Sequence, residues 1–183
     1  MSWFNTVLVL VAAFLAVFWE AAFNGARQAT GAQIDLLPAL IVYASLYSDL
    51  AGLTLLSVLG GLWFDSLSAN PLGVSVAPLF VIGLVIYAKR ELILRDQTLA
   101  QFVLGLGASA AAPALTLLLL LTTRHAPLLG WGTLWQWLVM SVGGAIATPV
   151  CFELFGWLNR ALVHRPVSEC SFRPDREIRR GRS

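Results

Sequence analysis

The chain is divided into long apolar runs separated by short polar breaks. Six runs carry few charged residues, and they cover residues 3–22, 34–47, 50–67, 72–88, 99–123 and 131–158. A helix needs about 20 apolar residues to cross the hydrocarbon core of a bilayer. Charged residues make up only 12% of the chain and hydrophobic residues 58%, whereas soluble domains carry about 25% charged residues. The pattern therefore predicts an all-α integral membrane protein with six transmembrane helices.

The first apolar run, residues 3–22, is predicted to be a retained span rather than a cleaved signal peptide. No Lys or Arg precedes it, and it is longer than the roughly 7–15 apolar residues of a signal-peptide core. Glu20 falls in its last turn. Because charged side chains near the end of a span usually extend toward the headgroups, we expect Glu20 to reach the interface or to pair with Arg27.

Two further carboxylates lie near the ends of apolar runs. Asp35 suits a helix N-terminus, where a carboxylate meets unpaired N–H groups, and Pro38 is tolerated in the first turns of the helix that follows. Glu153 lies near the basic end of the chain and is expected to pair with Arg160 or to be wetted at the interface. A role of Glu153 in proton-coupled transport is the alternative.

Basic residues are distributed unevenly along the chain. Of the twelve Lys and Arg residues, seven lie from Arg160 onward, three lie between residues 89 and 95, and the other two are Arg27 and Arg124. With six spans and a cytoplasmic N-terminus, the first two groups face the cytoplasm, as the positive-inside rule favours. We therefore predict a six-helix membrane domain over residues 1–163 with both termini cytoplasmic. The arginine-rich tail, residues 164–183, is expected to be disordered and to lie near anionic lipids.

Several functional classes find no support in the residues. The chain has two histidines and two cysteines without metal-ligand spacing, and Cys151 lies in an apolar run while Cys170 lies in the polar tail. It contains no Gly-rich phosphate loop and no plausible Ser/His/Asp set. We therefore expect no metal, no cofactor and no enzymatic activity. A run of arginines alone does not predict binding to nucleic acid.

One stretch, residues 60–73, combines small residues, a carboxylate and a chain reversal. Ser57, Gly61 and Asp65 are spaced by four residues, so they share one helix face, on which small side chains let another helix approach closely. Gly60 belongs to the same small-residue surface, which is expected to pack internally or against a partner helix. Because a carboxylate at a helix C-terminus opposes the helix dipole, we expect Asp65 to have a specific partner, such as a backbone N–H nest or a hydroxyl. Contact with headgroup water and capping of the following turn remain open.

This stretch resembles the signature of a known family. Gly61-Leu62-Trp63-Phe64-Asp65, then five residues, then Pro71-Leu72-Gly73, is similar to the G-L-x-x-D-x(5)-P-x-G motif of the bacterial rod shape-determining protein MreD family. Ile34-Asp35-Leu36-Leu37-Pro38 also matches the Asp- and Leu-rich start of that family's second helix. The length, the six spans and the short loops agree over residues 1–163. The motif positions carried over to this chain are Gly61, Asp65, Pro71 and Gly73.

The resemblance implies a non-enzymatic scaffold of the bacterial inner membrane that supports lateral peptidoglycan synthesis and rod shape. The implied partner is MreC, which connects to the RodA and penicillin-binding-protein synthase, and MreB filaments lie on the cytoplasmic side. The family fold is similar to the six-helix substrate-binding subunits of energy-coupling-factor transporters. This chain departs from the family in its longer arginine-rich tail, and direct contact of that tail with the cytoskeleton or with lipid stays open.

The main alternative is a substrate-binding membrane subunit of an energy-coupling-factor vitamin transporter. Such a subunit needs an outward cavity with convergent polar groups, and the predicted outer loops hold few polar residues for a polar vitamin. A proton-coupled secondary transporter is a third interpretation. It lacks support because the sequence shows neither paired midplane charges nor internal inverted repeats.

Overall fold

The computed structural model describes residues 2–22, 31, 34–68, 71–93, 97–122 and 130–162. Within these ranges the chain forms six α-helices, so the predicted all-α fold is confirmed. The helices are α1 (Ser2–Ala22), α3 (Leu37–Tyr47), α4 (Leu50–Leu67), α5 (Val76–Lys89), α6 (Thr98–Thr122) and α7 (Trp131–Leu162). The predicted basic tail, residues 164–183, lies outside the described residues, and so do Arg27, Arg124, His125, His164 and Cys170.

Three helices, α4, α6 and α7, are long and apolar enough to cross a membrane. The helices α3 and α5 have 11 and 14 residues, which correspond to about 16 and 21 Å at the rise of an α-helix. The helices in the predicted spans 34–47 and 72–88 begin three and four residues later than predicted, at Leu37 and Val76. Pro38 has no N–H and fits only the first turn, so α3 begins at Leu37. Gly73 has a φ of +91°, and the chain around it forms a turn before α5 begins at Val76.

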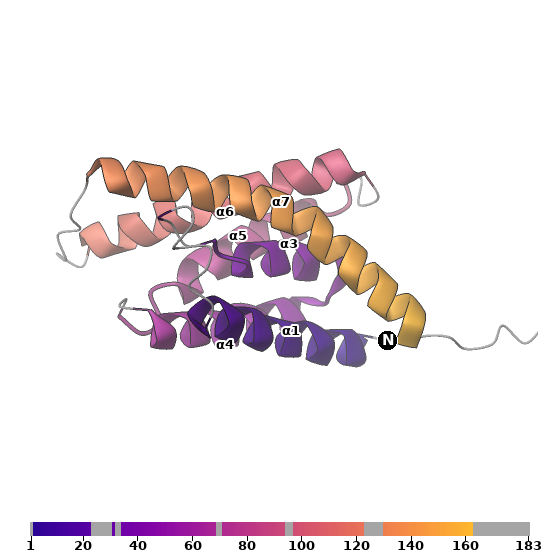
Figure 1. The fold of residues 1–183 in the computed structure, drawn as a ribbon. Helices are drawn as coiled ribbons and strands as arrows, with labels where there is room; N and C mark the ends of the chain where they lie inside the picture. Colours follow the sequence, from indigo (N-terminus) through magenta and orange to yellow (C-terminus); the bar gives the residue numbers. More distant parts are fainter. Residues whose placement is uncertain are drawn as a thin grey trace, which may run out of the picture.

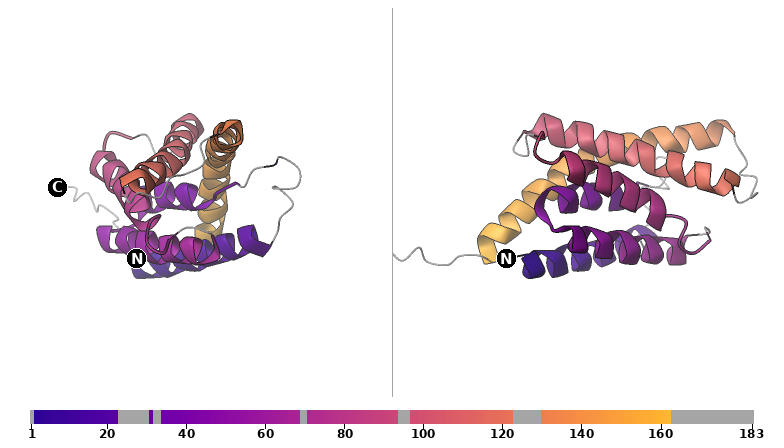
Figure 2. Two further views of the ribbon diagram at one scale, coloured as in Figure 1. Left: turned by 90° about the vertical axis from the view of Figure 1, so that its left-hand side faces the viewer. Right: turned by 180° about the vertical axis from the view of Figure 1, so that it is seen from behind.

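The helices are arranged at three levels (Figure 1). The long helices α6 and α7 pair along one side, α1 and α4 lie side by side on the opposite side, and α3 and α5 lie between the two pairs. The same order is visible from behind (Figure 2). The first turn of α1 and the last turn of α7 lie at one end of the bundle. Pro149 lies inside α7, which bends toward the level of α1 in its second half.

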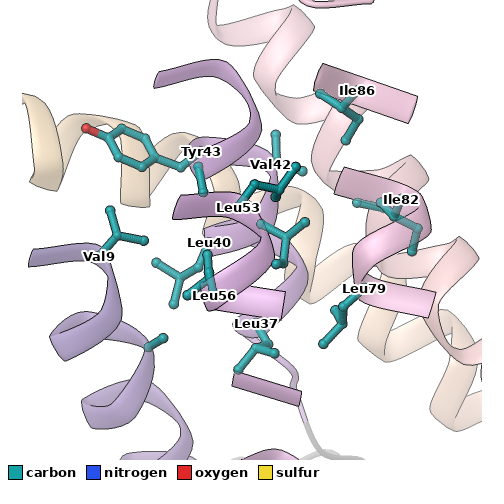
Figure 3. Close-up of a cluster of buried hydrophobic side chains, with 14 of the residues drawn as sticks. Val9, Leu37, Leu40, Val42, Tyr43, Leu53, Leu56, Leu79, Ile82 and Ile86 are labelled. Carbon is teal, nitrogen blue, oxygen red and sulfur yellow. The ribbon is translucent and has the colours of Figure 1, made fainter. Parts of the chain in front are cut away.

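The short helix α3 is the centre of the bundle. It contacts each of the other five described helices, and every residue from Leu37 to Leu46 is buried. Its neighbours contribute apolar side chains on both sides, with Val9 of α1 on one side and Ile82 and Ile86 of α5 on the other (Figure 3). Because α3 is apolar all round and enclosed, it needs no polar face.

Small residues set how closely the long helices approach. A Cβ atom at Gly144 of α7 would overlap Ser109 of α6, and a Cβ atom at Gly105 of α6 would overlap Thr148 of α7. A Cβ atom at Gly83 of α5 would lie 2.6 Å from Leu53 Cδ1. Lipid tails are as apolar as leucine, so helices in a bilayer associate through such close packing rather than through the hydrophobic effect.

The outer faces of the helices carry large apolar side chains. Phe18 and Trp19 of α1, Val85 of α5 and Trp135 of α7 each expose more than half of their surface. A soluble protein rarely exposes apolar surface on this scale. The exposed faces fit a lipid surrounding, in agreement with the three helices that are long enough to span one.

Candidate functional site

Asp65 lies at the end of α4 and is 2% exposed. Its Oδ2 atom accepts hydrogen bonds from the backbone N–H groups of Gly73, at 2.8 Å, and Ser75, at 3.1 Å. The expectation of a backbone N–H nest as its partner is confirmed. The carboxylate opposes the dipole of its own helix but lies at the N-terminus of α5, where negative charge is favourable. It therefore fastens the end of one helix to the beginning of the next.

Glycines on both sides of Asp65 make this corner possible. A Cβ atom at Gly61 would lie 2.8 Å from Val76 Cγ2 and 2.9 Å from Val76 Cα, so only glycine allows the start of α5 to lie against α4. Gly73 takes the left-handed backbone conformation that aims its N–H at Asp65. Pro71 opens the turn and is exposed, and its carbonyl accepts from the N–H of Val74 at 3.3 Å.

The other two predicted packing positions contact the chain itself. Ser57 is fully buried and donates through Oγ to the carbonyl of Leu53 at 2.9 Å. A Cβ atom at Gly60 would lie 3.3 Å from Leu37 Cδ2 of α3. The small-residue surface of α4 is thus covered by α3 and α5, which supports the internal-packing alternative for these residues.

A pair of carboxylates, Glu20 and Asp35, lies at the N-terminus of α3. Oε1 of Glu20 accepts the N–H of Leu36 at 2.6 Å, and Oδ1 of Asp35 accepts the N–H of Leu37 at 2.9 Å. The expected capping role of Asp35 is confirmed. The expected extension of Glu20 toward the headgroups is wrong, because its side chain turns inward to the backbone of the α3 entry. The alternative pairing with Arg27 lies outside the described residues. Its Oε2 atom is buried without a hydrogen-bond partner among the described residues.

Sequence patterns do not indicate the Glu20 contact, because a bond across sixteen residues depends on how α1 packs against the start of α3. The signal that existed was local. An acidic residue two positions before Leu37 and three before Pro38 is typical of a capped helix start. That Glu20, at the end of the preceding run, reaches the same helix end can be recognised only from the folded structure.

A cavity of about 310 Å³ lies beside both carboxylate sites. Phe64 and Ser68 line it from the end of α4, Ser75 and Leu79 line it from the start of α5, and Asp35 lines it from the entry to α3. Pro78 of α5 also lines it, and the second half of α6 and the first half of α7 supply Ala112, Pro113, Thr116, Leu117, Leu120, Gln136 and Met140. Sequence analysis did not anticipate this cavity, because its lining comes from five separate segments.

The remaining candidate side chains that the structure describes are Glu153, Arg160 and Cys151. Glu153 is exposed on α7, which fits the wetted alternative, and Arg160 donates through Nε to the carbonyl of Gly156 at 3.2 Å. Cys151 is half-buried. Among the residues that the structure describes, no three His, Cys, Asp or Glu side chains gather in a way that would hold a metal ion.

Comparison with known proteins adds no relative: no family model, no curated protein and no solved structure matches the chain.

Proposed function

We propose that this chain is a non-enzymatic scaffold of the bacterial inner membrane with six transmembrane helices, similar in role to the MreD family. The observation that carries the proposal is the corner at Asp65. The motif shared with that family places Gly61, Asp65 and Gly73 in one local arrangement, and each has a distinct task in it. A motif whose parts depend on one another in this way is less easily explained as a chance match of apolar residues.

The polar groups of the corner support scaffolding better than catalysis. One oxygen of Asp65 is used in two backbone hydrogen bonds, and the side chain is closed off from solvent. A general acid or base must reach its substrate at hydrogen-bond distance. Asp65 instead fixes the shape of the helix ends, and that shape would be what a partner recognises.

The proposed topology places both termini in the cytoplasm and the Asp65 corner at the outer face. The partner would be MreC, and through it the RodA and penicillin-binding-protein synthase that performs lateral peptidoglycan synthesis. MreB filaments and anionic lipids would be met on the cytoplasmic side, the lipids by the basic tail at residues 164–183.

A second candidate is favoured by one observation. The cavity of about 310 Å³ has polar residues on its wall, as a substrate-binding subunit of an energy-coupling-factor transporter requires. The predicted six-helix shape is common to both candidate functions, so identifying the proteins that bind this chain is what distinguishes them.

The test is crosslinked affinity purification of the full chain from the membranes of its native bacterium. The scaffold proposal expects a single-span membrane protein with a coiled coil, together with cell-wall synthases. Recovery of ATPase subunits with a coupling membrane protein would instead establish the transporter candidate. Recovery of neither set would contradict both.

A further inference from the structure

The cavity beside Asp35 has the size and position of a ligand site. Its volume of about 310 Å³ lies at the lower end of the roughly 300–1,000 Å³ typical of small-molecule sites. It opens among the ends of α4 and α6 and the beginnings of α5 and α7, opposite the end where α1 begins. Five segments of the chain meet around it, so the fold forms it before any ligand arrives.

The polar side of the cavity is negative. Asp35 is only 7% exposed and lines the cavity, and one of its oxygens accepts a single backbone N–H. An ionised carboxylate offers about four acceptor positions. Ser75, 6% exposed, also lines the cavity. Among the residues that the structure describes, none that lines the cavity is basic.

Capping of α3 does not account for all of this negative charge. Glu20 and Asp35 both bond to the first N–H groups of one 11-residue helix. The N-terminus of a helix is equivalent to only about half a positive charge. Within the part of the chain that the structure describes, the basic residues are Lys89, Arg90 and Arg160, which lie in the last turns of α5 and α7 at the other end of the bundle. Two buried carboxyl groups at one helix end favour holding one proton between them, which leaves a single negative charge at this end of α3. A positive group in the cavity would pair with that remaining charge.

The other walls are apolar. Leu79, Leu117, Leu120 and Met140 surround the space, and Thr116 and Gln136 add neutral polar groups. A carboxylate or phosphate ligand would find no cation among the described lining residues and would meet Asp35 as a like charge. We propose that the cavity binds a small organic cation, with its protonated amine beside Asp35 and its apolar body against Leu79 and Met140. This inference concerns binding alone and does not depend on the scaffold role.

The test uses the full chain in lipid nanodiscs and three probes of similar shape. These are 2-phenylethylammonium, the neutral 2-phenylethanol and the anionic 3-phenylpropionate. Binding is measured by isothermal titration calorimetry, with empty nanodiscs subtracted to remove partitioning into lipid. The proposal expects saturable binding of the ammonium probe with a Kd at least tenfold lower than that of the alcohol, and no binding of the anion.

Two variants and one control locate the site. Asp35→Asn keeps the shape of the side chain and should remove the tenfold preference for the ammonium probe. Thr116→Trp should fill the cavity and abolish binding while Asp35 is retained. Asp49→Asn, at an exposed position between α3 and α4, should bind as wild type does. A folded Thr116→Trp protein keeps the test valid if Asp35→Asn does not fold.

Other outcomes would overturn the proposal. Equal affinity for the ammonium probe and the alcohol would mean that the negative charge of Asp35 plays no part in binding. Absence of saturable binding by the wild-type chain would contradict it directly. Binding of the ammonium probe only after Arg27→Gln or Arg124→Gln would show that the chain's own guanidinium fills the site. None of these results bears on which proteins copurify, so the scaffold proposal fails or stands separately.

Discussion

At the scale of single residues, Asp65 shows how one carboxylate can serve two helices. It lies in the last turn of α4, where a negative charge is unfavourable. Its side chain accepts hydrogen bonds from the N–H groups that lead into α5, where a negative charge is favourable. Its second oxygen, Oδ1, is buried without a hydrogen-bond partner among the described residues. The corner therefore depends on a few strong hydrogen bonds rather than on an extended polar network.

Replacing Asp65 with alanine should lower the free energy of unfolding by about 2–4 kcal/mol. The change leaves the N–H groups of Gly73 and Ser75 without their acceptor in a place with little access to water. Reversible unfolding in mixed micelles measures the effect. Asp49→Ala is the control, because Asp49 is exposed and makes no side-chain capping bond. Equal losses in the two variants would contradict the role assigned to the corner.

Replacing Gly61 with alanine should also destabilise the protein, by about 1–3 kcal/mol, because the added Cβ meets the backbone of Val76. Gly107 lies on α6 with nothing within 4 Å of an added Cβ, so it provides a matched control. Gly107→Ala should be neutral or stabilising by up to about 1 kcal/mol, the usual gain from alanine in a helix. The same unfolding assay separates the two variants, and an unchanged Gly61→Ala protein would mean that α5 does not rest on α4 there.

At the scale of helices, α4 has two different faces although leucines occur all along it. Leu53 is fully buried against the core, whereas Leu55, two residues along, is 48% exposed on the outer surface. The contrast places one face of α4 against α3 and α5 and leaves the other for lipid.

Leu53→Ala should therefore cost about 2–5 kcal/mol, as expected for a cavity in a packed interior. Leu55→Ala should cost less than about 1 kcal/mol, because lipid tails fill the space that the side chain leaves. Unfolding of both variants in the same micelles checks the pair. Similar losses would mean that α4 is rotated relative to the structure.

Sequence periodicity and hydropathy predicted the helices where polar residues bound the apolar run. Residues 50–67 match α4, because Ser48-Asp49 and Ser68 stop the helix on both sides. The starts of α3 and α5 are predicted too early, because apolar residues such as Leu36 and Leu72 also occupy the non-helical chain before each helix. Hydropathy does not distinguish apolar residues in a helix from apolar residues in a turn. The helix dipole predicted a specific partner for Asp65 and left open whether it is a backbone nest or a hydroxyl. The inward turn of Glu20 and the cavity arise from tertiary packing alone.

At the scale of the whole molecule, the charge distribution gives the proposed topology. A C-terminal fluorescent protein should be bright and a C-terminal alkaline phosphatase inactive, because ten of the twelve Lys and Arg residues then lie on the cytoplasmic side. Phosphatase joined after Ser68, following α4, should be active. Active phosphatase at the C-terminus would contradict the six-span arrangement.

The most direct measurement of the central claim is a complementation assay in the native bacterium. The chromosomal gene is replaced by wild type, Asp65→Ala or Asp49→Ala, and cell shape and recovery of the proposed MreC partner are scored together with membrane insertion. The account predicts rounded cells and reduced partner recovery for Asp65→Ala, with insertion retained, and normal rods for Asp49→Ala. Normal rods and full partner recovery with Asp65→Ala would contradict it.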